Sequence, residues 1–220
     1  MRVILICGFL GSGKDLVGEY LKEVAEEHGK TVKTFAFADK IRETLMKTFH
    51  LRNREDYDLF KRSTFLLSNS SFMRPLNGRE VLRDIGMAMR SCNERAFLED
   101  VSSRLDDNAY NIITDLRFHN EFDWARENGY TVVKVKKNGT VSDGHVSEHG
   151  FSDNVCDYVI ENNGTKEELR EKVKTIYNDI EKFESDTLGT MAEKVDYVIK
   201  YDGKTGRTER EYNVRRTKCS

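Results

Sequence analysis

The stretch Gly8-Phe9-Leu10-Gly11-Ser12-Gly13-Lys14 stands between a short apolar run, residues 2–7, and a segment whose apolar side chains recur every three to four residues. It matches the pattern G-x-x-x-x-G-K-[ST] of a phosphate-binding loop (P-loop) in all but the last position. Glycines here allow backbone angles that turn successive N–H groups inward, and these groups attract phosphate together with the helix N-terminus. We therefore predict that Gly8, Gly11, Ser12 and Gly13 hold the phosphates of a nucleoside triphosphate and that Lys14 reaches its β- and γ-phosphates.

Asp15 stands where the pattern has Ser or Thr, whose hydroxyl normally contacts Mg²⁺. A carboxylate can take the ion or one of its waters, because Mg²⁺ prefers oxygen ligands. Alternatively, Asp15 is only an acidic residue in the first turn of a helix, where the helix dipole favours negative charge. Both interpretations stay open. Ser12 is a residue close in sequence that does carry a hydroxyl group.

Five short runs rich in β-branched or aromatic residues predict strands at 3–7, 32–37, 110–114, 131–136 and 157–160. Most are almost continuously apolar, as buried parallel strands are. Helical patterns separate them, and the last helix begins at Thr165, which forms a capping-box pattern with Glu168. The sequence therefore predicts an α/β P-loop NTPase fold: three α/β/α layers around a five-stranded, mostly parallel sheet.

The same patterns divide the chain. We predict a P-loop domain over 1–183, in which about 50–78 lacks a clear core pattern and is a candidate for a mobile acceptor-binding segment. Residues 184–220 form an extension, in which two strand-like runs, 195–201 and 207–214, flank a turn-rich stretch and predict a β-hairpin. The hairpin is either an edge addition to the sheet or a separate contact surface.

Charge and composition exclude several classes of protein. Lys and Arg number 36 against 38 Asp and Glu, so there is no global basic field for duplex nucleic acid. No apolar run approaches the length of a membrane span. The four cysteines form no C-x-x-C pair, which favours reduced thiols over zinc or disulfides. The N-K-x-D segment by which GTP-binding switch proteins recognise guanine is absent. Where a motor protein would have paired acidic residues, this chain has only Asp115, followed two residues later by Arg117. That arginine favours a second anion beside the P-loop.

Six segments in order resemble the bacteriophage deoxynucleoside monophosphate kinases, relatives of adenylate-kinase-type, dephospho-CoA and phosphomevalonate kinases. The resemblance runs over roughly residues 1–180 and leaves out the tail from about Glu184. The segments are the loop with Lys14-Asp15, Phe37-Ala38-Asp39-Lys40-Ile41-Arg42, Gly78-Arg79-Glu80-Val81-Leu82-Arg83-Asp84-Ile85-Gly86, Asp115-Leu116-Arg117-Phe118-His119-Asn120-Glu121, His145-Val146-Ser147-Glu148 and Asn162-Asn163-Gly164-Thr165.

The resemblance implies an activity: ATP- and Mg²⁺-dependent phosphorylation of deoxynucleoside monophosphates to diphosphates. The partners are then ATP and the monophosphate, and the location is the cytoplasm, that of the host if the protein is viral. Whether the chain acts alone or as a homodimer stays open, as do the accepted bases and the choice between deoxyribose and ribose. Two alternatives remain: a kinase for another phosphorylated small molecule, of dephospho-CoA or phosphomevalonate type, and a nucleotide-binding regulatory protein without turnover.

The resemblance also implies roles for single residues. The expected catalytic residues are Lys14, Arg117 and Asp115, and the expected acceptor-binding residues are Asp39, Arg42, Arg79 and Arg117. Asn162 and Gly164 are expected to flank the adenine ring, and Asp15 and Asp115 are expected to be linked to the metal ion. Simpler interpretations stay beside these roles. The arginines are otherwise exposed helix residues, Asp39 is otherwise an N-cap, and Asp115 is otherwise a capping residue for the helix near Asn120.

Overall fold

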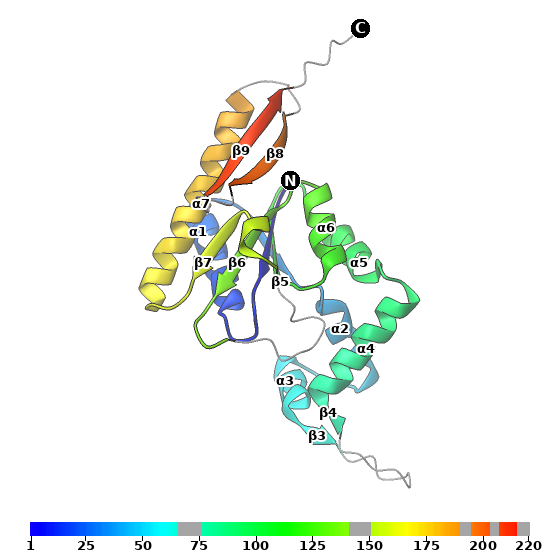
Figure 1. Cartoon of the computed structure of the whole chain (residues 1–220). Coiled ribbons are helices and arrows are strands. Elements are labelled where there is room, and N and C mark those ends of the chain that lie inside the picture. Colours follow the sequence, from blue (N-terminus) through cyan, green and yellow to red (C-terminus); the bar gives the residue numbers. More distant parts are fainter. Residues whose placement is uncertain (66–75, 141–150, 190–194, 203–206, 215–220) are drawn as a thin grey trace.

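A five-stranded parallel sheet forms the centre of the computed structural model, which describes residues 1–65, 76–140, 151–189, 195–202 and 207–214 (Figure 1). The strand order is β2-β5-β1-β6-β7, and every neighbouring pair is parallel. The strands are β1 Arg2–Cys7, β2 Val32–Phe35, β5 Tyr110–Leu116, β6 Thr131–Lys136 and β7 Tyr158–Glu161. All five predicted strands are therefore confirmed, with ends shifted by a few residues. The quoted segment at 145–148 lies outside the described residues.

Helices cover both faces of this sheet. Alternate side chains of β1 pack on opposite faces of the sheet. Ile4 and Ile6 lie in one core, with α1 (Lys14–Glu27) and α7 (Lys166–Gly189). Val3 and Leu5 lie in the other core, with α5 (Ala96–Arg104) and α6 (His119–Glu127). This is the period of two expected of a strand that is buried on both faces. The predicted three-layer α/β/α architecture is confirmed.

A third, smaller core lies beyond the carboxyl end of the sheet, away from the N-terminus (Figure 1). It joins α2 (Asp39–Thr48), α3 (Arg54–Arg62) and α4 (Gly78–Cys92) through Leu45, Tyr57 and Phe60. The sequence analysis predicted no helix at α3, because only Tyr57 and Phe60 of its nine residues are buried, too few for a clear periodicity. Its start is fixed by Asn53, whose side chain accepts a hydrogen bond from the Asp56 N–H at 2.8 Å.

Two small antiparallel sheets complete the described chain. One pairs β3 (Thr64–Phe65) with β4 (Leu76–Asn77) at the tip of the third core. The other is the predicted hairpin, β8 (Val195–Asp202) with β9 (Arg207–Val214), which forms a sheet of its own rather than an edge of the central one. Helix α7 continues to Gly189, so the boundary predicted after residue 183 falls inside this helix. Among the described helices, none is long and apolar enough to cross a membrane.

The capping box predicted at Thr165 is present and is testable. The Glu168 N–H donates to Thr165 Oγ1 at 3.2 Å, and the Thr165 N–H donates to Glu168 Oε2 at 3.1 Å. We expect Thr165→Ala to lower the free energy of unfolding by about 1 kcal/mol, because the Glu168 N–H in the first turn loses its acceptor. Urea denaturation measures this loss. Thr175→Ala, which removes a hydroxyl from the middle of the same helix, is the control; equal losses in both variants would contradict a capping role.

Candidate functional site

The loop between β1 and α1 has the backbone that its glycines predict. Gly8, Gly11 and Gly13 have φ angles of 147°, 78° and 96°, which residues with a side chain rarely adopt. A Cβ at Gly8 would also collide with the carbonyl oxygen of Val135, so the loop lies directly against β6. The loop is therefore held in one shape at the carboxyl end of the central strand, where ligands of open α/β sheets bind.

Two polar side chains inside the loop fit a phosphate group. Lys14 is buried, and its Nζ donates a 2.8 Å hydrogen bond back to the carbonyl oxygen of Phe9. Ser12 is fully buried, and its Oγ has no hydrogen-bond partner among the described residues. A buried hydroxyl without a partner is costly, and a phosphate oxygen would satisfy it. Asp15 is exposed in the first turn of α1, as both interpretations of this residue allow.

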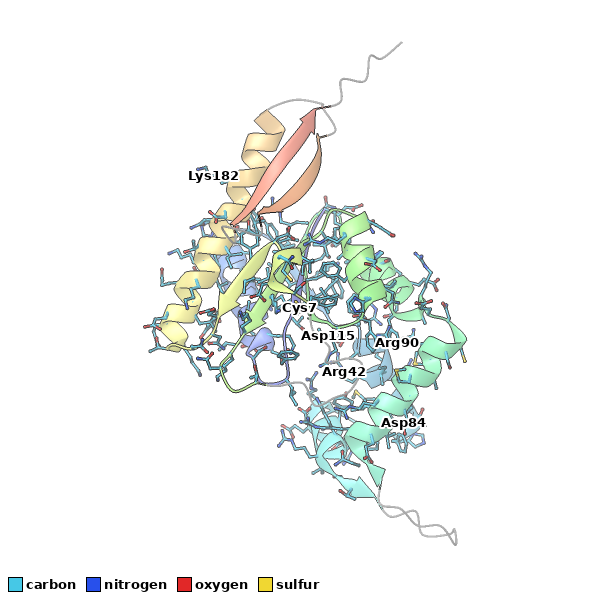
Figure 2. All side chains as sticks on the ribbon, in the orientation of Figure 1. Cys7, Arg42, Asp84, Arg90, Asp115 and Lys182 are labelled. Carbon is cyan, nitrogen blue, oxygen red and sulfur yellow. The ribbon has the colours of Figure 1, made fainter. Side chains whose placement is uncertain are left out.

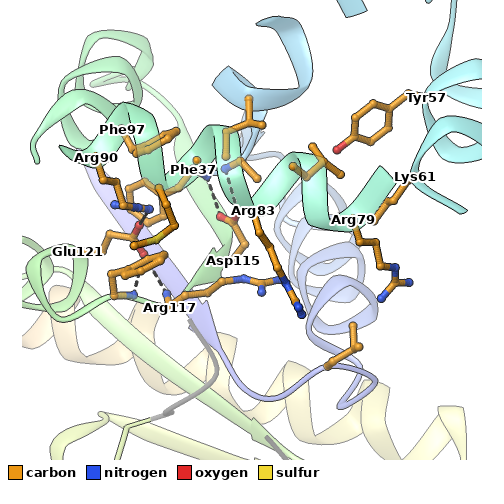
Figure 3. A pocket seen from close by; sticks show the side chains of 17 residues that line it. Phe37, Tyr57, Lys61, Arg79, Arg83, Arg90, Phe97, Asp115, Arg117 and Glu121 are labelled. Carbon is orange, nitrogen blue, oxygen red and sulfur yellow. Dashed lines mark hydrogen bonds and ion pairs between the residues drawn. The ribbon is translucent and has the colours of Figure 1, made fainter. Parts of the chain in front are cut away.

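A pocket opens beside this loop, between the end of β5 and the helices of the third core (Figure 3). Leu10 of the P-loop forms part of its wall, so the two sites adjoin. The pocket has a cationic end, formed by Lys61, Arg79, Arg83 and Arg117, and an aromatic end, formed by Phe37, Phe97 and Phe118 with Arg90 and Glu121. Figure 3 shows the side chains of Arg79, Arg83 and Arg117 extending away from the Arg90–Glu121 end.

The positive charges at the cationic end repel one another, which favours the binding of an anion. The pKa of Lys61 lies below its usual value, first because the side chain is partly buried and then because Arg79 and other arginines, Arg117 among them, repel its charge. A bound anion would offset the repulsion that the neighbouring arginines exert on the charge of Lys61. The planar guanidinium groups of Arg79 and Arg117 suit a phosphate with two parallel hydrogen bonds.

Asp115 ties the end of β5 to the loop before α2. Its carboxylate accepts hydrogen bonds from the N–H groups of Phe37 at 2.7 Å and Ala38 at 3.0 Å. Burial raises the pKa of Asp115, while these N–H donors and the Arg117 charge oppose the rise. The predicted alternative, a cap for the helix near Asn120, is wrong: Glu121 fills that place. Its Oε2 accepts from the N–H groups of Arg117 at 2.9 Å and Phe118 at 3.1 Å.

Asp39 and Arg42 pair with each other. One carboxylate oxygen of Asp39 accepts from the Ala36 N–H at 2.9 Å, and the other lies 2.7 Å from Nη2 of Arg42. Neither residue is among those that line the pocket, although Arg42 and Asp115 lie in the same part of the molecule (Figure 2). Their acceptor-binding role stays a prediction. So does a metal-linked role for Asp15 and Asp115, since no group of three or more potential metal ligands gathers in the described part of the chain.

The aromatic end of the pocket is built around a buried ion pair. Nη2 of Arg90 lies 2.6 Å from Oε1 of Glu121. The guanidinium of Arg90 also lies over the rings of Phe118, at 3.7 Å from the ring centre, and Phe97, at 4.3 Å. Burial raises the pKa of Glu121 to about 7, although Arg90 and the two N–H donors act to lower it.

The sequence analysis assigned no role in this site to Arg83 or Glu121. Arg90 is only a further candidate in the sequence, and Lys61 lies in the 50–78 stretch predicted as a candidate acceptor-binding segment. A signal for the two arginines was present: Arg79, Arg83 and Arg90 are spaced by four and seven residues, which places them on one face of α4. No separate signal was present for Lys61, because the helix that carries it, α3, was not predicted. Glu121 was quoted as part of a segment, but its partner Arg90 lies 31 residues earlier.

Comparison with known proteins gives a match over part of the chain. Residues 89–173 match a protein-family model. The family that this model describes is deoxynucleotide monophosphate kinase. Over 81 residues the chain is 37% identical to the deoxynucleotide monophosphate kinase of Escherichia phage RB69, a match that covers 36% of this chain and 32% of that protein. The resemblance inferred from the sequence is confirmed over residues 89–173, which include Arg90, Arg117 and Glu121. The chain matches only about a third of the length of the phage RB69 relative.

Two solved structures are similar to the chain at low sequence identity. The shikimate kinase from Aquifex aeolicus vf5 is 14% identical, with a TM-score of 0.43 over 81% of this chain and 96% of that chain. A gluconokinase from Sinorhizobium meliloti 1021 is 14% identical, with a TM-score of 0.42 over 81% and 93% of the respective chains.

Proposed function

We propose that this protein transfers the γ-phosphoryl group of ATP to a deoxynucleoside monophosphate, which gives ADP and the deoxynucleoside diphosphate. The observation that carries the proposal is the pair of adjoining anion sites: the P-loop, and the cationic end of the pocket that shares Leu10 with it. The choice of acceptor is supported by the deoxynucleotide monophosphate kinase match, which covers the pocket residues Arg90, Arg117 and Glu121.

The donor side uses the P-loop residues. Lys14 would leave the Phe9 carbonyl and neutralise the β- and γ-phosphates, and the buried Ser12 hydroxyl would gain an oxygen partner. Ser12 and Asp15 are the oxygen ligands that the chain offers at the loop, which fits Mg²⁺, and that ion would supply further neutralisation of phosphate charge. The protein's own contribution is to fix the direction of the phosphates with backbone N–H groups.

The acceptor side needs charge and alignment rather than a base. A phosphomonoester has its second pKa near 6, so at pH 7 its oxygen is already a nucleophile. Lys61, Arg79, Arg83 and Arg117 would hold this dianion beside the donor site, which reduces repulsion between the two phosphates. The aromatic end of the pocket would then receive the base, because flat apolar rings pack well on one another.

The hydroxyl-acceptor alternative, of dephospho-CoA type, is less well supported by this site. Such an acceptor requires a general base to remove a proton. Asp115 is the pocket carboxylate nearest to Arg117 in sequence, but both its oxygens are engaged by the Phe37 and Ala38 N–H groups. Glu121 is engaged by Arg90 and by two N–H groups.

A direct assay tests the proposed function. The purified protein is incubated with ATP and Mg²⁺ against separate deoxynucleoside monophosphates, ribonucleoside monophosphates and dephospho-CoA, and the products are resolved by chromatography. We expect deoxynucleoside diphosphates and ADP in equal amounts. If ADP forms at the same slow rate with and without any monophosphate, the proposed kinase activity is wrong and a nucleotide-binding protein without an acceptor is favoured.

Replacement of Arg117 tests the acceptor site separately. Arg117→Ala removes a pocket cation, and charge-assisted hydrogen bonds of this kind contribute about 1.5–3 kcal/mol. We therefore expect the KM for the monophosphate to rise by about tenfold to a hundredfold, with a much smaller change in the KM for ATP. Steady-state kinetics with each substrate varied measures both. Arg52→Ala, an exposed arginine outside the pocket, is the control; an equal effect of the two variants would contradict an acceptor-binding role for Arg117.

A further inference from the structure

The turn between β7 and α7 is joined to the P-loop by one side chain. Nδ2 of Asn162 donates a 2.8 Å hydrogen bond to the backbone carbonyl oxygen of Ser12. The backbone of Asn162 is fixed in turn, since its N–H donates to the carbonyl oxygen of Lys136 at 2.7 Å. Asn162 thus links the end of β6 to the P-loop, and it lies 150 residues from Ser12 in the sequence.

The amide of Asn162 fits a space that only glycine leaves open. A Cβ built on Gly13 would collide with Nδ2 of Asn162. The positive φ of Gly13 and its missing side chain are therefore matched to this contact as well as to the turn itself. Gly13 and Asn162 form a complementary pair in which the side chain of one occupies the place left empty by the other.

The hydrogen bond to Ser12 sets the direction of a P-loop N–H group. A peptide unit is planar and trans, so its C=O and N–H point in opposite directions. When Asn162 holds the Ser12 carbonyl, the N–H of Gly13 is turned to the other side of the peptide plane. The rest of the loop is anchored nearby, because the Ser12 N–H donates to Phe9 at 3.1 Å and the Gly13 carbonyl accepts from Val17 at 3.0 Å.

We propose that Asn162 is a positioning residue for the P-loop: its side-chain amide orients the Ser12–Gly13 peptide toward the donor phosphates and does not read the donor base. The proposal rests on the proposed function only in that the P-loop binds the phosphates of the donor. The adenine-flanking role expected for Asn162 and Gly164 is mostly one of the turn's backbone, and the proposal adds a separate role for the Asn162 amide, which hydrogen-bonds to the loop. Contacts between adenine and the backbone of the turn are unaffected by it.

A ligand that lacks a nucleobase distinguishes positioning of the P-loop by Asn162 from recognition of the donor base. Inorganic tripolyphosphate, ATP and GTP are titrated into the wild-type protein and into Asn162→Ala by isothermal titration calorimetry. Loss of the hydrogen bond that orients one phosphate-binding N–H should weaken all three ligands by a similar factor, about tenfold. Weaker binding of ATP alone, with unchanged tripolyphosphate binding, would show that Asn162 reads the base and would overturn the proposal.

Two further variants exclude a general loss of structure. Asn162→Asp keeps the size of the side chain but places a carboxylate oxygen against the Ser12 carbonyl, so it should bind tripolyphosphate no better than Asn162→Ala; wild-type affinity would overturn the proposal. Asn163→Ala is the matched control, because the Asn163 side chain accepts from the Asn138 N–H at 2.8 Å and not from the P-loop. If thermal stability falls in Asn162→Ala while tripolyphosphate affinity stays unchanged, the residue is merely structural and the proposal fails.

The same titrations distinguish this proposal from the proposed kinase activity. Tripolyphosphate and ATP binding require no acceptor, so the role of Asn162 can be confirmed in a protein that phosphorylates no monophosphate. Conversely, active wild-type protein with unaffected Asn162 variants would overturn only the positioning role. Wild-type protein that binds neither tripolyphosphate nor ATP would overturn both.

Discussion

Lys14→Ala is expected to abolish phosphoryl transfer, with a fall in kcat of about a thousandfold, the effect of removing one preorganised group that stabilises transition-state charge. Lys14 is the first residue of α1, and its ammonium group already lies inside the P-loop, 2.8 Å from the Phe9 carbonyl. No other lysine is present between residues 1 and 21 to replace it. The variant should therefore retain its fold while losing the charge that neutralises the β- and γ-phosphates.

Kinetics and spectroscopy together test this expectation. Circular dichroism and thermal unfolding should show a folded Lys14→Ala protein, because the lost hydrogen bond to the Phe9 carbonyl contributes only about 1 kcal/mol. Lys22→Ala is the matched control: Lys22 lies on the same helix, with 47% of its side chain exposed and only a 3.8 Å ion pair to Glu26. We expect this control to keep full activity. A Lys14→Ala enzyme that retains more than about a tenth of wild-type kcat would show that the donor phosphates lie elsewhere.

The fold was predictable because its strands and its phosphate loop carry strong local signals. Strands such as Arg2–Cys7 are buried on both faces and therefore have short, nearly continuous apolar sequences. The glycines of the P-loop are required by backbone angles, which depend on the local chain. By contrast, α3 was missed because Tyr57 and Phe60 face a small core that α2 and α4 complete. Its sequence alone has too little apolar periodicity to reveal that core.

The candidate site was predictable only where its chemistry is local. Arg79 and Arg117 were identified from their segments and do line the pocket. The contacts of Asp115 were not predictable, since its carboxylate binds N–H groups 77 and 78 residues earlier in the chain. The same holds for Asn162 and Ser12. Such contacts arise when distant loops meet at the carboxyl ends of parallel strands, and neither partner signals the other in the sequence.

Glu121→Ala is expected to cause the largest loss of stability among the substitutions considered, about 3–5 kcal/mol in the free energy of unfolding. The side chain of Glu121 is 1% exposed, pairs with Arg90 and accepts two N–H groups at the start of α6. Alanine would leave the Arg90 charge buried without its partner and would leave both N–H groups without an acceptor. Glu127→Ala, an exposed acid on the same helix, is the control and should change stability by no more than about 0.5 kcal/mol.

The pH dependence of stability isolates the charge of Glu121 from its hydrogen bonds. Its pKa is raised in the folded protein from an ordinary 4.5 to about 7, so between these values the folded state binds more protons than the unfolded state. The contribution of Glu121 to stability is therefore greatest below pH 4.5 and declines as the pH rises toward 7. Glu121→Gln keeps an acceptor oxygen but cannot ionise, so it should destabilise less than Glu121→Ala and should lose this decline. Urea denaturation of the wild-type protein and of Glu121→Gln at pH 5, 6, 7 and 8 measures the difference; parallel pH profiles would show that Glu121 ionises normally and that Arg90 compensates for its burial.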